Sequence, residues 1–187
     1  MDFAAARANM VESQVRTADV TDLALTDAIR VATRETLLPA AKAHAAYADA
    51  TVEYAPGRFL LKPRDVAKLL QALHPRAGEQ ALAICAPYAA AVLEIMGVAV
   101  TRQDDPAAAI DGGPFDLVIC EGAVAKAPGA WSAVLSPGGR LGVVECSGPV
   151  GRAVLYVRAE EGIGSRPLFD ATAPVMEGFT PERGFAF

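Results

Sequence analysis

A short buried strand followed at once by a helix marks the part of the sequence best placed for chemistry. Residues 81–84 are an apolar run, the turn Cys85-Ala86-Pro87 follows, and residues 88–96 have the composition of a packed helix. A helix that starts directly after a buried strand presents free backbone N–H groups to a ligand. This layout is typical of a nucleotide- or S-adenosylmethionine-binding unit. Such turns are normally rich in glycine, yet no glycine lies between Gly78 and Gly97.

Composition and charge restrict the classes of function. The 187 residues are 52% hydrophobic and 21% charged, which is ordinary for one globular domain. The net charge of -5 argues against nucleic acid and against an acidic membrane as partners. No apolar run approaches the ~20 residues of a spanning helix, and the N-terminus lacks the basic start of a signal peptide. We therefore expect a cytoplasmic protein with one domain, residues 1–187.

Within this domain the hydrophobic pattern predicts a mostly helical region, residues 1–75, and an α/β core, residues 79–187. Asp22 is placed to cap a helix whose apolar stripe begins at Leu25 and which Pro39 bounds. A second helix is predicted to begin at Pro63 and to end at Pro75.

Short apolar runs bounded by turn residues predict the strands of the core, at residues 81–84, 98–101, 117–120, 141–146 and 153–158. Runs that are apolar on both faces favour a mostly parallel sheet covered by helices, the three-layer, doubly wound α/β class. Gly162 lies where a hairpin would return the chain as an antiparallel strand. Residues 178–187 predict a loop and a final edge strand.

Six segments, in order along nearly the whole chain, carry a resemblance to a known family. They are "NMVESQVRTADVTD" (9–22), "AYAD" (46–49), "GRFLLKP" (57–63), "FDLVICEGAV" (115–124), "LSPGGRLGVV" (135–144) and "RPLFDATAPVMEGF" (166–179). Together they resemble the protein-L-isoaspartate O-methyltransferase family. The resemblance implies a Rossmann-like methyltransferase fold that binds S-adenosylmethionine at the carboxyl ends of the central strands. It also implies protein repair by methylation of the carboxylate of isoaspartyl residues.

The turn after the first core strand departs from this pattern. The family has an acidic residue late in that strand, where this chain has Ala83, and a longer, glycine-rich loop where it has Cys85, Ala86 and Pro87. Side chains at these three positions occupy space that the cofactor needs, and they make positive φ angles costly. The resemblance therefore places cofactor-binding positions here while the residues themselves argue against binding.

The next unit is shortened. Only 17 residues, 98–114, lie between the helix after the turn and the apolar run that begins at Phe115. This leaves room for one strand and a turn. We expect that about one β/α unit is absent, the unit that ordinarily builds the adenosine side of the pocket. Asp104 and Asp105 follow the remaining strand, either as acids that contact a ribose or adenine, or as a capped turn before Pro106. Glu121 and Gly122, after the central strand, are further positions of the family's site.

The segment aligned with the family's reacting region differs from the family's pattern at two polar positions. A hydroxyl-bearing residue and a glutamine are replaced by Leu61 and Lys62, and Pro63 alone is kept. Because a carboxylate is already nucleophilic, methylation requires positioning more than a base. We assign no catalytic residue.

Three cysteines are each predicted at the carboxyl end of a strand. Cys85, Cys120 and Cys146 would lie on neighbouring strands, either as a metal or redox site or as small apolar core residues. The second interpretation is preferred, and no metal site is predicted.

Two hypotheses about function follow. The preferred one is a pseudoenzyme, a methyltransferase-like scaffold without cofactor that acts as a binding or structural module through a protein partner or self-association. The alternative is an active S-adenosylmethionine-dependent isoaspartyl carboxyl methyltransferase with a divergent site at Asp104, Asp105, Glu121 and Gly122. A small apolar ligand in the shrunken crevice is a third, lesser possibility. The missing unit is expected to leave the strand at residues 98–101 with an uncovered edge, which invites pairing.

Overall fold

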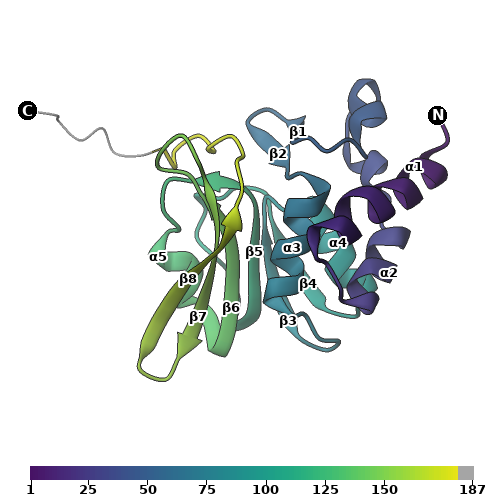
Figure 1. Cartoon of the computed structure of the whole chain (residues 1–187). Helices are drawn as coiled ribbons and strands as arrows, with labels where there is room; N and C mark the ends of the chain where they lie inside the picture. The colour runs from purple at the N-terminus through teal and green to yellow at the C-terminus, as the bar shows by residue number, and fades with distance from the viewer. Residues whose placement is uncertain (181–187) are drawn as a thin grey trace, which may run out of the picture.

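A six-stranded sheet forms the centre of the molecule (Figure 1). The structure is a computed structural model that describes residues 1–180. Most of the expected final edge strand, at residues 178–187, therefore lies outside the described residues. The spatial order of the strands is β4 (Ala99–Gln103), β3 (Gln80–Ile84), β5 (Phe115–Val124), β6 (Leu135–Glu145), β7 (Arg152–Ala159) and β8 (Gly162–Asp170).

The directions of the strands confirm the expected fold class. β4, β3, β5 and β6 run parallel, whereas β7 and β8 are antiparallel to their neighbours. The hairpin between β7 and β8 closes at the pair Ala159 and Gly162, as the glycine indicated. β4 is the edge strand next to the shortened unit, and three of its five residues are exposed.

The N-terminal elements cover one face of the sheet (Figure 1). They are α1 (Phe3–Met10), η1 (Val11–Val15), η2 (Arg16–Ala18), α2 (Leu23–Val31), η3 (Arg34–Leu37) and η4 (Ala40–Ala45), followed by α3 (Pro63–Leu73) and α4 (Pro87–Ile95). Apolar residues of these segments and of the sheet form one large core. In the described part of the chain, no helix is long and apolar enough to cross a bilayer.

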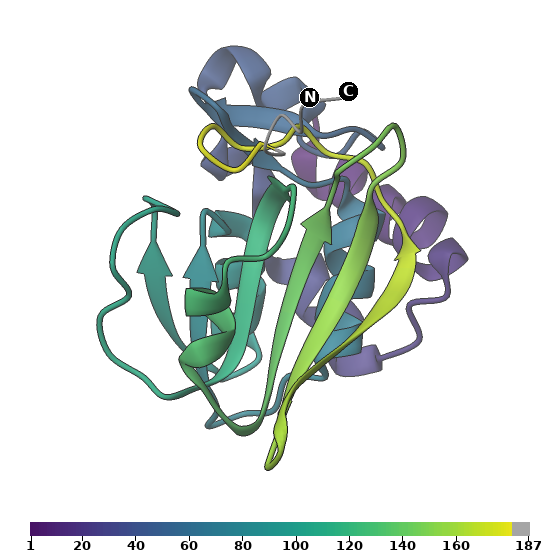
Figure 2. The ribbon, with the colours of Figure 1, turned by 90° about the vertical axis from the view of Figure 1, so that its left-hand side faces the viewer.

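A second, smaller core lies on the opposite face, which Figure 2 shows from the front. The short helix α5 (Gly129–Ala133) contributes Trp131, and the long connection between β4 and β5 contributes Ile110. These residues cover Leu82 and Ile84 of β3, which are almost completely buried. The connection between β4 and β5 and the short helix α5 therefore cover this face of the sheet next to β4.

The hairpin of β1 (Val52–Ala55) and β2 (Arg58–Leu60) lies above the carboxyl ends of the parallel strands (Figure 2). It leads directly into α3, which begins with Pro63 in its first turn, as expected. α3 ends at Leu73 because His74 adopts a left-handed conformation before Pro75.

The expectation that the helix capped by Asp22 runs to Pro39 is wrong. Asp22 does cap α2, accepting a hydrogen bond from the Leu25 amide, but the helix ends at Val31. The chain leaves the helix and carries Arg34 into the interior, where its guanidinium donates to the carbonyls of Ala46 and Leu61. Tertiary hydrogen bonds to this buried side chain outweigh the local preference for helix.

Gly151 provides a test of how the chain after β8 is held against the sheet. A Cβ at this position would lie 2.4 Å from the Ala171 carbonyl oxygen, whereas one at Gly148 would meet nothing within 4 Å. We expect Gly151→Ala to destabilise the fold by about 1–3 kcal/mol, since backbone must move. Gly148→Ala is the matched control, with little change expected. Urea denaturation of both variants measures the difference, and equal midpoints would show that this approach is not tight.

Candidate functional site

The first turn of α4 is capped by a buried carboxylate of the same chain. Glu121, on β5, has no exposed surface, and its Oε2 accepts hydrogen bonds from the amides of Tyr88 (2.9 Å) and Ala89 (3.0 Å). These are free N–H groups of a helix N-terminus, which also carries partial positive charge. Such groups commonly bind an anionic part of a ligand. Here the side chain of Glu121 occupies that position.

Arg34 lies close to this carboxylate and is also completely buried. Its Nε donates to the Ala46 carbonyl at 2.8 Å, and its guanidinium carbon lies 4.8 Å from the centre of the Tyr88 ring. Burial raises the pKa of the Glu121 carboxyl, while the positive charge of Arg34 and the backbone amides oppose that shift. The result is a charged, closed cluster between the N-terminal region and the sheet.

The cluster contains polar atoms without hydrogen-bond partners. Arg34 Nη1, Tyr88 Oη and Glu121 Oε1 are buried and form no hydrogen bond with any described residue. Each such atom costs about 1–3 kcal/mol. Sequence reasoning did not identify Arg34 as part of the site, because it lies in no pattern that predicts a buried polar contact.

The turn Cys85-Ala86-Pro87 is filled by its own side chains and by the β1–β2 hairpin. Cys85 has φ = +47°, the left-handed conformation that glycine adopts more readily, at a cost of roughly 1–2 kcal/mol. Its Sγ donates to the Asp104 carbonyl at 3.1 Å, and the Tyr54 hydroxyl donates to its carbonyl at 3.3 Å. Cys85 and Ala86 are buried. One residue of the turn thus has a left-handed backbone, and the buried side chains fill the space above the turn.

The segment after β8 closes the crevice from the side of β5. Met176 is completely buried, and its amide donates to the Ala123 carbonyl at 2.9 Å. A Cβ on Gly122 would lie 2.9 Å from the Met176 sulfur, so a side chain at this position would require the flexible end of Met176 to shift. Gly122 therefore contacts chain rather than an open cavity.

Asp104 and Asp105 directly follow β4 and are exposed, whereas the Glu121 carboxylate is buried. The Asp105 carboxylate accepts from the Ala107 amide at 3.0 Å, which is the geometry of a capped turn. Asp104 contacts Cys85 and Arg58 through its backbone carbonyl. In this structure the two residues organise a turn, and their carboxylates form no hydrogen bond with Glu121 or Gly122.

The segment before α3 provides backbone groups rather than polar side chains. Leu61 is buried, and its carbonyl accepts a hydrogen bond from Arg34. Lys62 precedes α3, and Pro63 is its first residue. This segment therefore positions Arg34.

The cysteines lie on neighbouring strands, as expected, but do not form one cluster. Cys85 and Cys120 are buried in the second core, whereas Cys146 is partly exposed and its Sγ lies 3.4 Å from the Gly148 carbonyl. Burial raises the pKa of Cys85 to about 11 and that of Cys120 well above its usual range. Raised pKa values leave few reactive thiolates at neutral pH. Within residues 1–180, no group of three or more potential ligands is arranged for a metal ion.

The parallel sheet, the helices on both faces and the strand–turn–helix crevice define a Rossmann-like methyltransferase fold. A solved structure from Plasmodium falciparum, a putative protein-L-isoaspartate O-methyltransferase in complex with S-adenosyl-L-homocysteine, aligns with a TM-score of 0.72 at 15% identity. The alignment covers 95% of this chain and 99% of that one. A second solved protein-L-isoaspartate O-methyltransferase gives the same TM-score at 16% identity and covers 93% of this chain and 67% of its own. At these identities the likeness shows the fold.

Curated relatives define the family. The protein-L-isoaspartate O-methyltransferases of Methylorubrum extorquens and Methylorubrum populi are each 33% identical, over 95% and 93% of this chain and over 91% and 96% of their own lengths. No family model matches the sequence. The chain belongs to the protein-L-isoaspartate O-methyltransferase family. The M. extorquens alignment spans 208 positions, more than the 187 residues here, so that relative contains residues without counterparts in this chain.

The raised pKa of Glu121 predicts a specific dependence of stability on pH. Above the ordinary range of a glutamate, the folded chain keeps a proton that the unfolded chain releases. The stability that Glu121 contributes is fully present below the pKa that it has in the unfolded chain. It is lost as the pH rises through the higher pKa that it has in the folded chain. We expect Glu121→Gln, which cannot ionise, to gain stability relative to the wild type as pH rises from 4 toward 8.

Urea denaturation of both proteins at each pH measures this difference, in which the other titrating groups cancel. A difference that does not change with pH, or that shrinks, would show that the carboxyl is held ionised by the helix N-terminus. Glu121→Ala should be less stable than either protein at all pH values, because the Tyr88 and Ala89 amides lose their acceptor.

Proposed function

We propose that this chain is a pseudoenzyme of its family, a scaffold that no longer binds S-adenosylmethionine and acts as a non-catalytic binding or structural module. The observation that carries this proposal is the Glu121 carboxylate on the first turn of α4. It satisfies internally the N–H groups that an anionic ligand group would use.

The chemistry of the cofactor makes this contact important. Its methionine part carries a carboxylate, which a glycine-rich turn and a helix N-terminus would normally receive. A ligand carboxylate at the same N–H groups would have to displace the Glu121 carboxyl from a completely buried position. Cys85 and Met176 fill adjoining space, so that the ligand would also need these segments to move.

The reacting region supports the same conclusion. Carboxyl methylation requires that the substrate be positioned in line with a methyl donor. The segment before α3 offers the buried apolar side chain of Leu61, and its carbonyl is already used by Arg34. The hydroxyl-bearing residue and the glutamine of the family's pattern are absent from this segment, where Leu61 and Lys62 stand instead.

Calorimetric titration with S-adenosylhomocysteine tests the proposal. We expect no heat of binding at millimolar ligand from a folded sample and no methyl transfer to an isoaspartyl peptide. The M. extorquens relative, assayed in parallel, is the positive control. Binding in the micromolar range would overturn the proposal and favour the alternative, an active carboxyl methyltransferase with ligand contacts from Asp104, Asp105, Glu121 and Gly122.

The free edge of β4 is the proposed route of association. In residues 1–180, no strand pairs with β4 on the side away from β3. The Ala99 amide donates to the Glu79 carbonyl just before β3, so the Val100 amide, next along the strand, points away from the sheet. Unpaired N–H and C=O groups on an edge strand form a template for another strand.

We expect the protein to self-associate through this edge at high concentration. Sedimentation should show a dimer for the wild type and a monomer for Val100→Pro, which removes an outward donor without changing the ladder to β3. Thr101→Lys, at an exposed position, provides a second variant that places like charges together at such an interface. A wild-type monomer at high concentration, or variants that dimerise equally well, would contradict this assignment.

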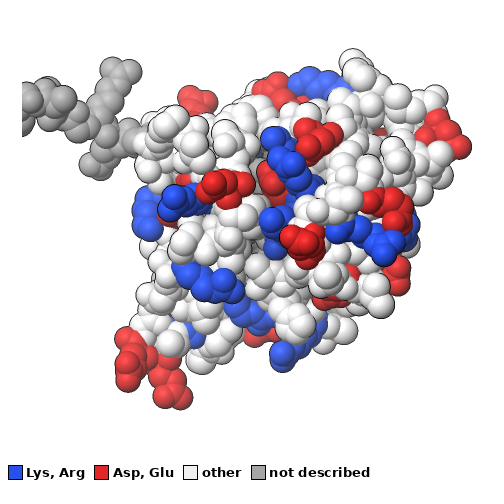
Figure 3. Space-filling model, viewed as in Figure 1, with Lys and Arg blue, Asp and Glu red and all other residues white. Residues whose placement is uncertain are grey.

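The three cysteines are free thiols, which is consistent with a reducing compartment such as the cytoplasm. Figure 3 shows acidic and basic side chains mixed over the face that it displays, without a broad area of positive charge. This distribution favours a protein partner over nucleic acid.

A further inference from the structure

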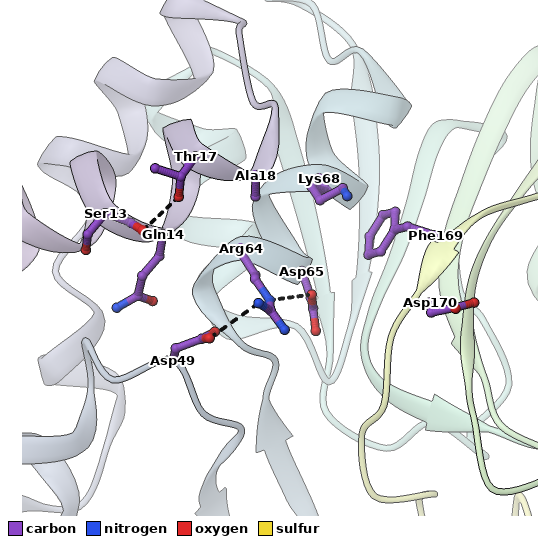
Figure 4. Close-up of a pocket in the computed structure, with 10 residues that line it drawn as sticks. All are labelled: Ser13, Gln14, Thr17, Ala18, Asp49, Arg64, Asp65, Lys68, Phe169 and Asp170. Carbon is purple, nitrogen blue, oxygen red and sulfur yellow. Dashed lines mark hydrogen bonds and ion pairs between the residues drawn. The ribbon is translucent and has the colours of Figure 1, made fainter.

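A polar cavity of about 260 Å³ lies between the N-terminal segment, α3 and the end of β8 (Figure 4). The closed crevice at Glu121 contributes no residue to it. Its lining comes from four separate parts of the chain: residues 13–18 of η1 and η2, Asp49 in the connection between η4 and β1, the first turns of α3, and the last residues of β8.

Uncharged polar groups of the lining offer mainly acceptor oxygens. The hydroxyls of Ser13 and Thr17 donate their hydrogens to the carbonyls of Asn9 and Ser13, both at 2.7 Å, which leaves their oxygens as acceptors. The Gln14 amide nitrogen donates to the Tyr47 carbonyl at 2.8 Å. Its Oε1 is buried and accepts no hydrogen bond from any described residue.

Among the charged groups, acids outnumber bases. Arg64 lies between two aspartates, with Nη1 3.4 Å from Asp49 and Nε 3.6 Å from Asp65 (Figure 4). Lys68 extends over the Phe169 ring, with its nitrogen 4.4 Å from the ring centre. Asp170 completes the lining, so that three carboxylates stand against two cations.

Two of these carboxylates are weakly compensated. Asp170 has one partner, Arg152, at 3.6 Å, and both side chains are exposed, which makes such a pair worth little. Asp65 is buried, and its contact with Arg64 is longer than a hydrogen bond. Arg64 therefore forms long ion pairs with both Asp49 and Asp65 and a short hydrogen bond with neither.

We propose that this cavity binds a cationic group that brings its own N–H donors, an alkylguanidinium or an alkylammonium. The cation would supply the positive charge that the lining lacks and the donors that its oxygens lack. An anion is disfavoured, because Asp49, Asp65 and Asp170 outnumber the two cations of the lining, Arg64 and Lys68, and Arg64 lies between two of these acids. This proposal is independent of whether the crevice at Glu121 binds a cofactor.

Two sources share this chemistry, the arginine side chain of a partner protein and a free diamine. Calorimetric titration of the full chain with N-acetyl-arginine amide and with putrescine distinguishes them by affinity. N-acetyl-citrulline amide is the matched uncharged probe, and N-acetyl-aspartic acid amide is the anionic one. We expect saturable binding of at least one cationic probe, weakened by added salt, and no binding of the citrulline or aspartate probes.

Variants connect the binding to this cavity. Asp170→Asn should lower the affinity for the cationic probe about tenfold, which is the loss expected for one charge-assisted hydrogen bond. Asp49→Asn should weaken it similarly, because Arg64 is then released toward the cation. Glu161→Gln, an exposed residue of the β7–β8 turn, is the control of equal charge change and should bind as the wild type does.

Thermal unfolding of each variant verifies that it is folded. Three results would overturn the proposal: no binding of either cationic probe at millimolar concentration, equal binding of the citrulline probe, or equal weakening by Glu161→Gln. Tighter binding of the arginine probe than of putrescine would identify a protein side chain as the occupant, and the reverse order a free amine.

Discussion

The contact on which the centre of the structure depends is the carboxylate of Glu121 against the first turn of α4. It joins the middle strand of the sheet to the helix that follows the neighbouring strand. Arg34 connects the same point to the N-terminal region, because its guanidinium reaches the carbonyls of Ala46 and Leu61. Burying these charges is costly, so they are tolerated only where the surrounding segments hold them in place.

The backbone N–H groups at the start of α4 are bound by a side chain of the same chain. In a ligand-binding strand–turn–helix unit, these backbone N–H groups are free to donate hydrogen bonds to a ligand. Here a side chain satisfies them, and Cys85 and Met176 supply apolar contacts around the same crevice. Cys85 adopts a left-handed conformation although it is not glycine, and its side chain is buried.

The sequence predicted the sheet well and the site only in part, for physical reasons. Apolar runs and turn residues are local signals, so that β3, β5 and the hairpin at Gly162 could be located from them. Glu121 was expected directly after a central strand, but it lies within β5, three residues before that strand ends at Val124. The direction of its carboxylate depends on α4, which lies about thirty positions away, and no spacing rule links such residues. Arg34 lies in a polar stretch that looks exposed, which is why the end of α2 was misplaced.

The connection between β4 and β5 leaves the face and the edge of the sheet differently covered. On the face opposite α4, residues 104–114 and α5 cover β3, and Ile110 packs with Trp131 in the second core. At the edge, β4 is left with one neighbour in the described chain. A loop can bury apolar side chains, but it cannot replace the ladder of backbone hydrogen bonds that a missing strand would provide. In the described chain, the outer edge of β4 therefore keeps backbone N–H and C=O groups that no other strand pairs.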